Sequence, residues 1–259
     1  QERGHRVVFA LKPNALLQQE LAARGIEAHS LPISGKHNVL APLLLAWLAE
    51  HLGADVIHTH LSTASLWGTV AGRLAGIPTV ASAHAMVVRT CYLFADLIAT
   101  CSRGVAEHLI AQRVDPGRIR LLYNGVFPSD FEGLTPPAQV RAELGIPPGA
   151  PVIGEVAHLS PRKGQRYLVQ AVDLLRQRWP DLICLLVGEG REAPALARLI
   201  AELGLEEHVR MLGYRHDAVR LMQAMDVVVL PSVTIEGLGV CLIEAAMLRW
   251  EALESRAAG

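Results

Sequence analysis

Two glutamates eight residues apart, Glu236 and Glu244, stand out among the residues that could do chemistry. They follow the apolar run 226–230, which is typical of a buried strand, and Gly237 and Gly239 lie between them where an apolar helical pattern begins. A glycine-containing loop at a helix N-terminus presents backbone N–H groups that bind anions. The segment therefore predicts an anion site whose two carboxylates could reach different hydroxyl groups of one ligand.

A second candidate is the pair Lys163 and Gly164, which opens another helical pattern after the strand-like run 152–157. A fixed cation beside a helix N-terminus stabilises negative charge that develops on a departing phosphate. A lone Lys-Gly pair is more often the start of a surface helix, so this candidate depends on its context. The neighbouring Arg162 is either a second cation of the same site or a solvated surface charge.

The elements that must position these residues alternate between short β-branched runs and longer helical patterns. Apolar spacing of three and four indicates helices in segments such as 16–24, 65–75 and 193–203. Strand, helix, strand at this rhythm predicts an α/β fold with parallel sheets flanked by helices. The expected strands are 7–11, 27–31, 56–60, 79–83, 97–101 and 119–123, then 152–157, 183–187, 209–212 and 227–230.

A proline cluster divides the chain. Six of the 15 prolines fall within residues 128–151, a density that suits a stiff linker better than a continuous element. We therefore expect a first lobe over 1–127, a linker over 128–150, a second lobe over 151–248 and an unassigned tail over 249–259. Ligands of parallel sheets bind beyond the carboxyl ends of the strands, so the expected site is a cleft where the two lobes face each other.

Composition excludes several other classes. The chain has 24 basic and 25 acidic residues and only 5% aromatic residues, which argues against a nucleic-acid partner. Its four cysteines form no C-x-x-C pair, so we expect reduced core thiols and no metal site. The apolar segment 39–52 has no basic cluster beside it, so membrane contact is not predicted. No targeting pattern is visible, and the expected location is cytoplasmic.

Beyond these patterns, the chain resembles the retaining glycosyltransferases of family 4, also called group 1 glycosyl transferases. The resemblance covers residues 1 to about 247, and its segments recur in the family's order. They are Asp55-Val56-Ile57-His58-Thr59-His60, 77–84, 95–102, Leu122-Tyr123-Asn124-Gly125-Val126, 156–164, 186–190 and the two-glutamate segment 231–247. The family's fold, GT-B, consists of two facing Rossmann-like lobes, the first for the acceptor and the second for a nucleotide-sugar donor.

The resemblance implies a role for each candidate. Glu236 would hold hydroxyl groups of the donor sugar, Glu244 would accept hydrogen bonds from the ribose, and Lys163 would neutralise the diphosphate. Backbone N–H groups of the segment Gly237-Leu238-Gly239-Val240 would contact the sugar and phosphates, and Gly164 would let the backbone approach. His158 stands where the family usually has an arginine, and it lacks the two-pronged donor geometry of arginine, so its contact with the diphosphate would be weaker.

Other positions are less specific. His84 matches a family histidine that approaches the sugar or acceptor, and it is equally well explained as a structural histidine. Tyr214 and Arg215 follow a strand end where relatives hold the nucleotide base, and a surface loop explains them as well. His58 and His60 lie on one predicted strand, and we expect their side chains to point to opposite faces, which would disfavour a shared metal.

Both ends depart from the family pattern. A first strand with its glycine-rich turn has no counterpart before residue 3, and residues 248–259 match none of the family's closing elements. We therefore expect a fold truncated at both termini, with exposed sheet edges and low stability.

The most specific interpretation is a hexosyltransferase-type glycosyltransferase. It would move a sugar from a UDP- or GDP-sugar to a glycan or lipid-linked acceptor, without a metal or other cofactor. Two alternatives remain open: a nucleotide-sugar epimerase of the same fold, and a non-catalytic remnant that binds nucleotide or a partner. A dinucleotide dehydrogenase is disfavoured because no G-x-G-x-x-G follows any predicted strand.

Overall fold

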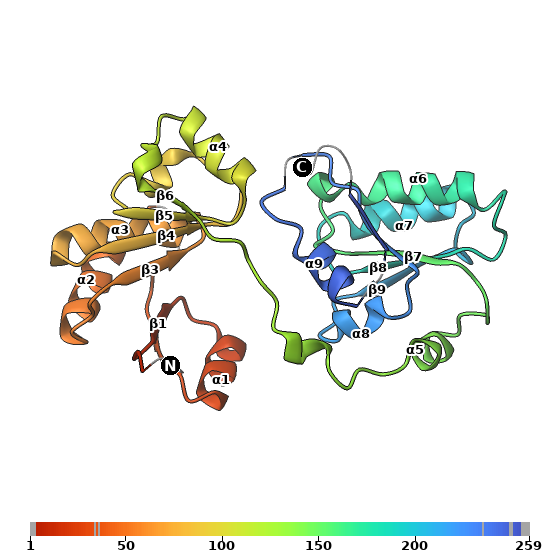
Figure 1. Cartoon of the computed structure of the whole chain (residues 1–259), viewed down its shortest axis with the longest axis horizontal. Coiled ribbons are helices and arrows are strands. Elements are labelled where there is room, and N and C mark those ends of the chain that lie inside the picture. The colour runs from red at the N-terminus through yellow and green to blue at the C-terminus, as the bar shows by residue number, and fades with distance from the viewer. Residues whose placement is uncertain (1–3, 34, 36, 235, 249–250, 255–259) are drawn as a thin grey trace. The chain divides into compact units, whose positions relative to one another are not determined.

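The computed structural model describes residues 4–33, 35, 37–234, 236–248 and 251–254 and divides the chain into two compact units, Gln1–Leu122 and Tyr123–Gly259. In both units every strand pairing is parallel. Helices follow the strands along the chain and pack on the sheets (Figure 1). The predicted class, α/β with parallel sheets flanked by helices, is confirmed.

Unit 1 contains two sheets. The first pairs β1 (Val8–Leu11) with β2 (Glu27–Ser30), and the second has the order β3-β4-β5-β6. The strands of the second sheet are β3 (Ile57–His60), β4 (Thr79–Ala83), β5 (Leu97–Thr100) and β6 (Ile119–Leu121). The helices are α1 (Ala15–Ala23), α2 (Ala41–His51), α3 (Ser62–Ala75) and α4 (Arg103–Ala111), with 3-10 turns at Arg89–Tyr92 and Pro116–Arg118.

Helix α3 packs closely on strands β3 and β4 because its buried face carries glycines. A Cβ at Gly68 would lie 2.4 Å from Cγ2 of Thr59, and one at Gly72 would lie 2.1 Å from Cγ2 of Thr79. The helix ends at Gly76, whose φ of 66° is in the left-handed region that glycine adopts readily. This packing fixes the sheet edge at which β3 and β4 end, where His60 and His84 lie.

Unit 2 contains a five-stranded sheet with the order β11-β10-β7-β8-β9. Its strands are β7 (Val152–Val156), β8 (Ile183–Val187), β9 (Val209–Gly213), β10 (Val227–Leu230) and β11 (Glu251–Glu254). Its helices are α5 (Pro137–Glu143), α6 (Gln165–Leu175), α7 (Ala193–Glu202), α8 (Ala218–Met222) and α9 (Val240–Met247), with 3-10 turns at Pro128–Phe131 and Pro161–Lys163.

The core of unit 2 has one layer on each face of this sheet. Side chains of β8 alternate between the layers: Leu185 and Val187 pack with residues of α5, α8 and α9, whereas Cys184 and Leu186 pack with residues of α6 and α7. Figure 1 shows α6 and α7 on one side of the sheet and α8 and α9 on the other. Strand β8 is buried along its whole length, as expected for a central parallel strand.

The segment expected to be a linker, 128–150, has structure of its own. Pro137 is the first residue of α5, and Val140 and Ile146 belong to the core of unit 2. Proline suits the first turn of a helix because its missing N–H has no intrahelical partner there. The compact-unit boundary accordingly lies between Leu122 and Tyr123, earlier than the expected end of the first lobe at 127.

The segment expected to be an unassigned tail, 249–259, also contributes an element. Strand β11 (Glu251–Glu254) pairs in parallel with β10 and forms the sheet edge. The remaining tail positions, 249–250 and 255–259, lie outside the described residues. This strand depends on pairing with β10, which the composition of 251–254 does not predict.

All four cysteines are buried free thiols, as the sequence predicted. Cys91 and Cys101 lie in unit 1, and Cys184 and Cys241 lie in unit 2. Burial raises the pKa of the Cys184 thiol well above its usual range and that of Cys241 to about 11. Among the helices that the structure describes, none combines the length and apolar character needed to span a bilayer.

Candidate donor-binding site

The strand order of unit 2 brings two loops together at one edge of the sheet. Strand β7 lies between β8 and β10, and the loop after β7 leads to α6 on one face while the loop after β10 leads to α9 on the other. A position where neighbouring strands are followed by helices on opposite faces is called a switch point, and parallel α/β sheets form ligand crevices there. The two loops are joined here by a hydrogen bond from the Val233 N–H to the Arg162 carbonyl oxygen, 2.9 Å long.

Glu236 is the centre of a charged cluster between these loops. Its Oε1 lies 2.9 Å from Nη1 of Arg162 and 2.9 Å from Nζ of Lys163, and the Ser232 hydroxyl donates a hydrogen bond to the same oxygen. Glu236 is 6% exposed, and the Lys163 side chain is 15% exposed. The structure therefore joins the two strongest sequence candidates directly and adds Arg162, for which a solvated surface role had been equally open.

The electrostatics of this cluster favour an ionised Glu236. Burial alone would raise the pKa of its carboxyl, but hydrogen bonds from Ser232 and Lys163, the charge of Lys163 and the Arg162 guanidinium outweigh burial and lower it. Two cations and one carboxylate give the cluster a net charge of about +1. A site with this charge can bind an anion and, through Glu236, hydroxyl groups.

The start of α9 supplies the backbone of the predicted anion site. Gly239 precedes the helix, Val240 begins it, and Gly237 is buried. The Val240 N–H donates to the Leu238 carbonyl oxygen at 3.0 Å, so one of the expected ligand-facing amides is engaged within the loop. Glu244 lies further along α9, half-buried, and burial together with the nearby Asp130 carboxylate raises its pKa.

The loop after β7 is anchored by the buried side chain of Gln165, which the sequence analysis missed. The Gln165 side chain, 2% exposed, donates to Oε1 of Glu155 at 3.2 Å and to the His158 carbonyl oxygen at 3.3 Å. Glu155 itself is 1% exposed, whereas His158 is exposed at the surface of the loop. A charged residue inside the apolar run 152–157 was the signal that could have identified Glu155.

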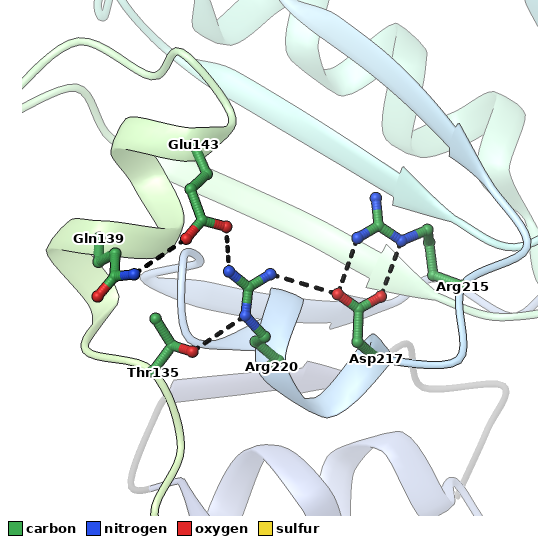
Figure 2. A network of polar contacts seen from close by, with 6 residues as sticks. All are labelled: Thr135, Gln139, Glu143, Arg215, Asp217 and Arg220. Carbon is green, nitrogen blue, oxygen red and sulfur yellow. Dashed lines mark hydrogen bonds and ion pairs between the residues drawn. The ribbon is translucent and has the colours of Figure 1, made fainter.

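Arg215 and Tyr214, the candidates for base binding, lie in a different network. Figure 2 shows Arg215 and Arg220 both bound to Asp217, and Arg220 bound in turn to Glu143 and Thr135. Both bonds from Arg215 to Asp217 are 2.8 Å long. Arg215 is thus committed to Asp217. Tyr214 is 60% exposed, and its ring makes an edge contact with the ring of His216.

In unit 1, His84 belongs to a row of histidines at the ends of β3 and β4. Its Nε2 lies 2.9 Å from Nδ1 of His60, and the ring centres of His60 and His58 are 4.4 Å apart. Nε2 of His58 lies 2.8 Å from the Ser82 hydroxyl. Burial lowers the pKa of His58 and of His60, and the neighbouring histidines lower both further.

The expectation that His58 and His60 point to opposite faces was wrong. Side chains alternate along a strand, so residues two apart share a face. Among the described residues, no group of three or more His, Cys, Asp or Glu side chains has a geometry that could hold a metal ion.

The fold and the charged cluster together define a class: parallel α/β proteins with a charged cluster at a strand switch point. Two family models match the chain, Glycosyltransferase Family 4 over residues 1–130 and Glycosyl transferases group 1 over residues 138–252. The first match covers half of the chain. The protein belongs to the group 1, family 4 glycosyltransferases.

Individual relatives agree with this assignment. The chain is 27% identical to UDP-Gal:alpha-D-GlcNAc-diphosphoundecaprenol alpha-1,3-galactosyltransferase of Escherichia coli, over 74% of this chain and 55% of the relative. It is 30% identical to 2-deoxystreptamine glucosyltransferase of Streptomyces kanamyceticus, over 80% and 64% respectively. The chain thus spans less than two thirds of the length of these curated relatives.

Solved structures have the same fold. The crystal structure of Anabaena Alr3699/HepE in complex with UDP and glucose has a TM-score of 0.85 and 25% sequence identity, covering 97% of this chain and 73% of that one. This likeness supports the GT-B architecture.

Proposed function

We propose that the protein is a retaining glycosyltransferase that moves a sugar from a UDP- or GDP-sugar to a glycan or a lipid-linked acceptor. The observation that carries the proposal is the convergence of Lys163 and Arg162 on Glu236 at the switch point of the unit 2 sheet. Cations beside a carboxylate suit a donor that has a diphosphate next to a sugar. The galactosyltransferase and glucosyltransferase relatives support the same reaction class.

In this proposal the diphosphate and Glu236 compete for the same two cations. As the donor binds, Lys163 and Arg162 turn to phosphate oxygens, and Glu236 becomes available to accept hydrogen bonds from sugar hydroxyl groups. The N-terminus of α9 adds its N–H groups, and Glu244 accepts hydrogen bonds from the ribose. Tyr214 is the better candidate for stacking on the base, because its ring is exposed while Arg215 is held by Asp217.

The chemical step breaks the bond between the anomeric carbon and the diphosphate oxygen, and the electron pair leaves with the diphosphate. The acceptor hydroxyl oxygen forms the new bond to the anomeric carbon, and its proton passes to the departing diphosphate. The sugar becomes oxocarbenium-like while charge grows on the leaving oxygen. Lys163 stabilises this charge effectively because its side chain is only 15% exposed. The proposal requires no metal cofactor, since the two cations supply the compensating charge. His84 is proposed to contact the sugar or an acceptor hydroxyl group.

The first test is isothermal titration with UDP, GDP and ADP, followed by transfer assays with UDP-glucose, UDP-galactose and GDP-mannose. Glu236→Ala should lower kcat/KM by about 100-fold or more, because a buried contact to the reacting sugar is lost. Glu206→Ala, at an exposed position of the same unit, is the matched control and should leave it unchanged. NMR of the product's anomeric carbon checks retention.

Three outcomes contradict the proposal. Nucleotide binding without turnover of any donor would favour a non-catalytic binding protein. Isomerised nucleotide sugar in the absence of acceptor would favour an epimerase. Full transfer activity in Glu236→Ala would remove Glu236 from the site.

A further inference from the structure

Glu155 is a carboxyl group buried beneath the charged cluster and used by no step of the proposed reaction. It lies on β7, immediately before the loop that carries Lys163, and is 1% exposed. Its Oε1 accepts one hydrogen bond from Gln165, while its Oε2 is buried without a hydrogen-bond partner among the described residues. A buried carboxylate oxygen with no donor is strongly disfavoured, so the geometry favours a protonated acid.

The charged and titratable groups around Glu155 come from every element packed against it. Lys163 in the following loop favours its ionised form, and Glu236 in the loop after β10 disfavours it. Cys184 on β8 and Cys241 on α9 also interact with Glu155, and burial keeps both as neutral thiols. Burial is the largest effect and raises the pKa of Glu155 to about 8. Its proton is therefore exchangeable near neutral pH.

We propose that Glu155 is a positioning residue of the donor site whose proton keeps the cluster of Arg162, Lys163 and Glu236 positively charged enough to bind a diphosphate. With Glu155 protonated, the two cations outnumber Glu236 and the cluster carries a net positive charge. When Glu155 ionises, this excess is cancelled. The inference rests on the proposed function, because it concerns the charge that the donor diphosphate encounters.

Gln165 connects this proton to the shape of the loop. Its side chain bridges Glu155 and the His158 carbonyl oxygen, and Gln165 is also the first residue of α6. Ionisation of Glu155 therefore changes the charge at the point where Gln165 anchors the loop after β7. If Glu155 only stabilised the loop, its ionisation would affect the binding of every ligand equally. In this proposal its ionisation weakens the binding of anionic ligands and leaves that of neutral ligands unchanged.

The test is the pH dependence of UDP and GDP binding in the wild type and Glu155→Gln. Bound diphosphate should raise the pKa of Glu155, and each unit of that shift changes Kd about tenfold between the protonated and ionised forms. For the wild type we expect Kd to rise about tenfold from about pH 6.5 to about pH 9. Glutamine mimics the protonated acid, so Glu155→Gln should keep the low-pH Kd with less than about a twofold change.

Two controls separate this effect from others. Glu206→Gln makes the same chemical change at an exposed position of unit 2 and should retain the full wild-type pH dependence. Uridine, which has no phosphate, should bind with the same affinity across the range. Infrared spectroscopy at neutral pH should detect the C=O band of a buried carboxylic acid in the wild type and its loss in Glu155→Gln.

The outcomes are distinguishable. If neither UDP nor GDP binds at any pH, the proposed function fails and this inference fails with it. If the nucleotides bind with the same pH dependence in the wild type and Glu155→Gln, only this inference is overturned. Absence of the carboxylic acid band in the wild type also overturns it, whatever the binding data.

Discussion

Gly164 lies against the backbone of Pro231, so close that a Cβ at position 164 would be 2.0 Å from the Pro231 carbonyl oxygen. Its φ of 78° is also in the left-handed region. The two loops of the candidate site can meet only because this residue has no side chain. The resemblance had assigned Gly164 to the approach of the ligand, and the structure adds an approach between the loops themselves.

Gly164→Ala should therefore destabilise the protein and disrupt the site together. We expect a loss of more than about 2 kcal/mol in the free energy of unfolding, because the neighbouring backbone must shift and the left-handed conformation is strained. Chemical denaturation measures it, and nucleotide titration measures the loss of binding. The matched control is Gly204→Ala, where φ is 60° and a Cβ would meet nothing within 4 Å. It should lose only about 1 kcal/mol and bind nucleotide normally; equal effects of both variants would contradict the contact argument.

Lys163 and Arg162 should differ in importance although both bind Glu236. The Lys163 side chain is 15% exposed and the Arg162 side chain 48% exposed, so solvent screens the arginine more. We expect Lys163→Ala to weaken UDP binding about 30-fold and Arg162→Ala by no more than about fivefold. Isothermal titration at low and high salt checks the order, and uridine serves as the ligand that neither variant should affect. A larger effect of Arg162→Ala would be inconsistent with this interpretation.

Glu155 should also make the free energy of unfolding fall as the pH rises. The pKa of its carboxyl is raised from 4.5 to about 8 by burial, so the folded protein holds a proton that the unfolded chain releases between these values. The stability due to this proton is complete below about pH 4.5 and is lost as the pH rises through about 8, amounting to roughly 3–5 kcal/mol. The difference between the wild type and Glu155→Gln, measured by denaturation across this range, should follow that curve. A flat difference would mean that Glu155 is ionised throughout.

Arg220 of α8 should hold α5 in place within unit 2. It binds Glu143 and Thr135 on one side and Asp217 on the other (Figure 2). We expect Arg220→Ala to lower the unfolding midpoint and to increase hydrogen exchange of the α5 amides several-fold, because the helix loses its contact through Glu143 and keeps its apolar contacts and those of Arg141 to Ala224 and Asp226. Arg198→Ala, in the exposed face of α7, is the control. Unchanged exchange in α5 would show that the core contacts of Val140 and the polar contacts of Arg141 suffice.

The sequence predicted the strands β1 to β10 and the residue types of the site, but neither β11 nor how the elements combine. Lys163 and Glu236 each had a local signal, a glycine at a helix start. Their direct ion pair depends on β7 and β10 being neighbours, and hydrophobic periodicity predicts strands without their order. The site of unit 2 is therefore formed by long-range pairing that no local pattern contains.

Three further differences concern particular residues. The prolines of 128–151 indicated a linker, yet Pro137 is a helix-starting proline and the residues after it join the core. His58 and His60 share a face because side chains two residues apart on a strand point the same way. Glu155 lies among the apolar residues of β7, and the pattern that predicts this strand depends on those residues alone.

The four buried thiols give the molecule a separate chemical reporter in each unit. Because the thiols of Cys91 and Cys101 belong to unit 1 and those of Cys184 and Cys241 to unit 2, a thiol reagent labels each unit only when that unit opens. Mass spectrometry of the labelled peptides would then time the opening of the two units independently within one sample. The native sequence thus permits a comparison of local unfolding without any introduced probe.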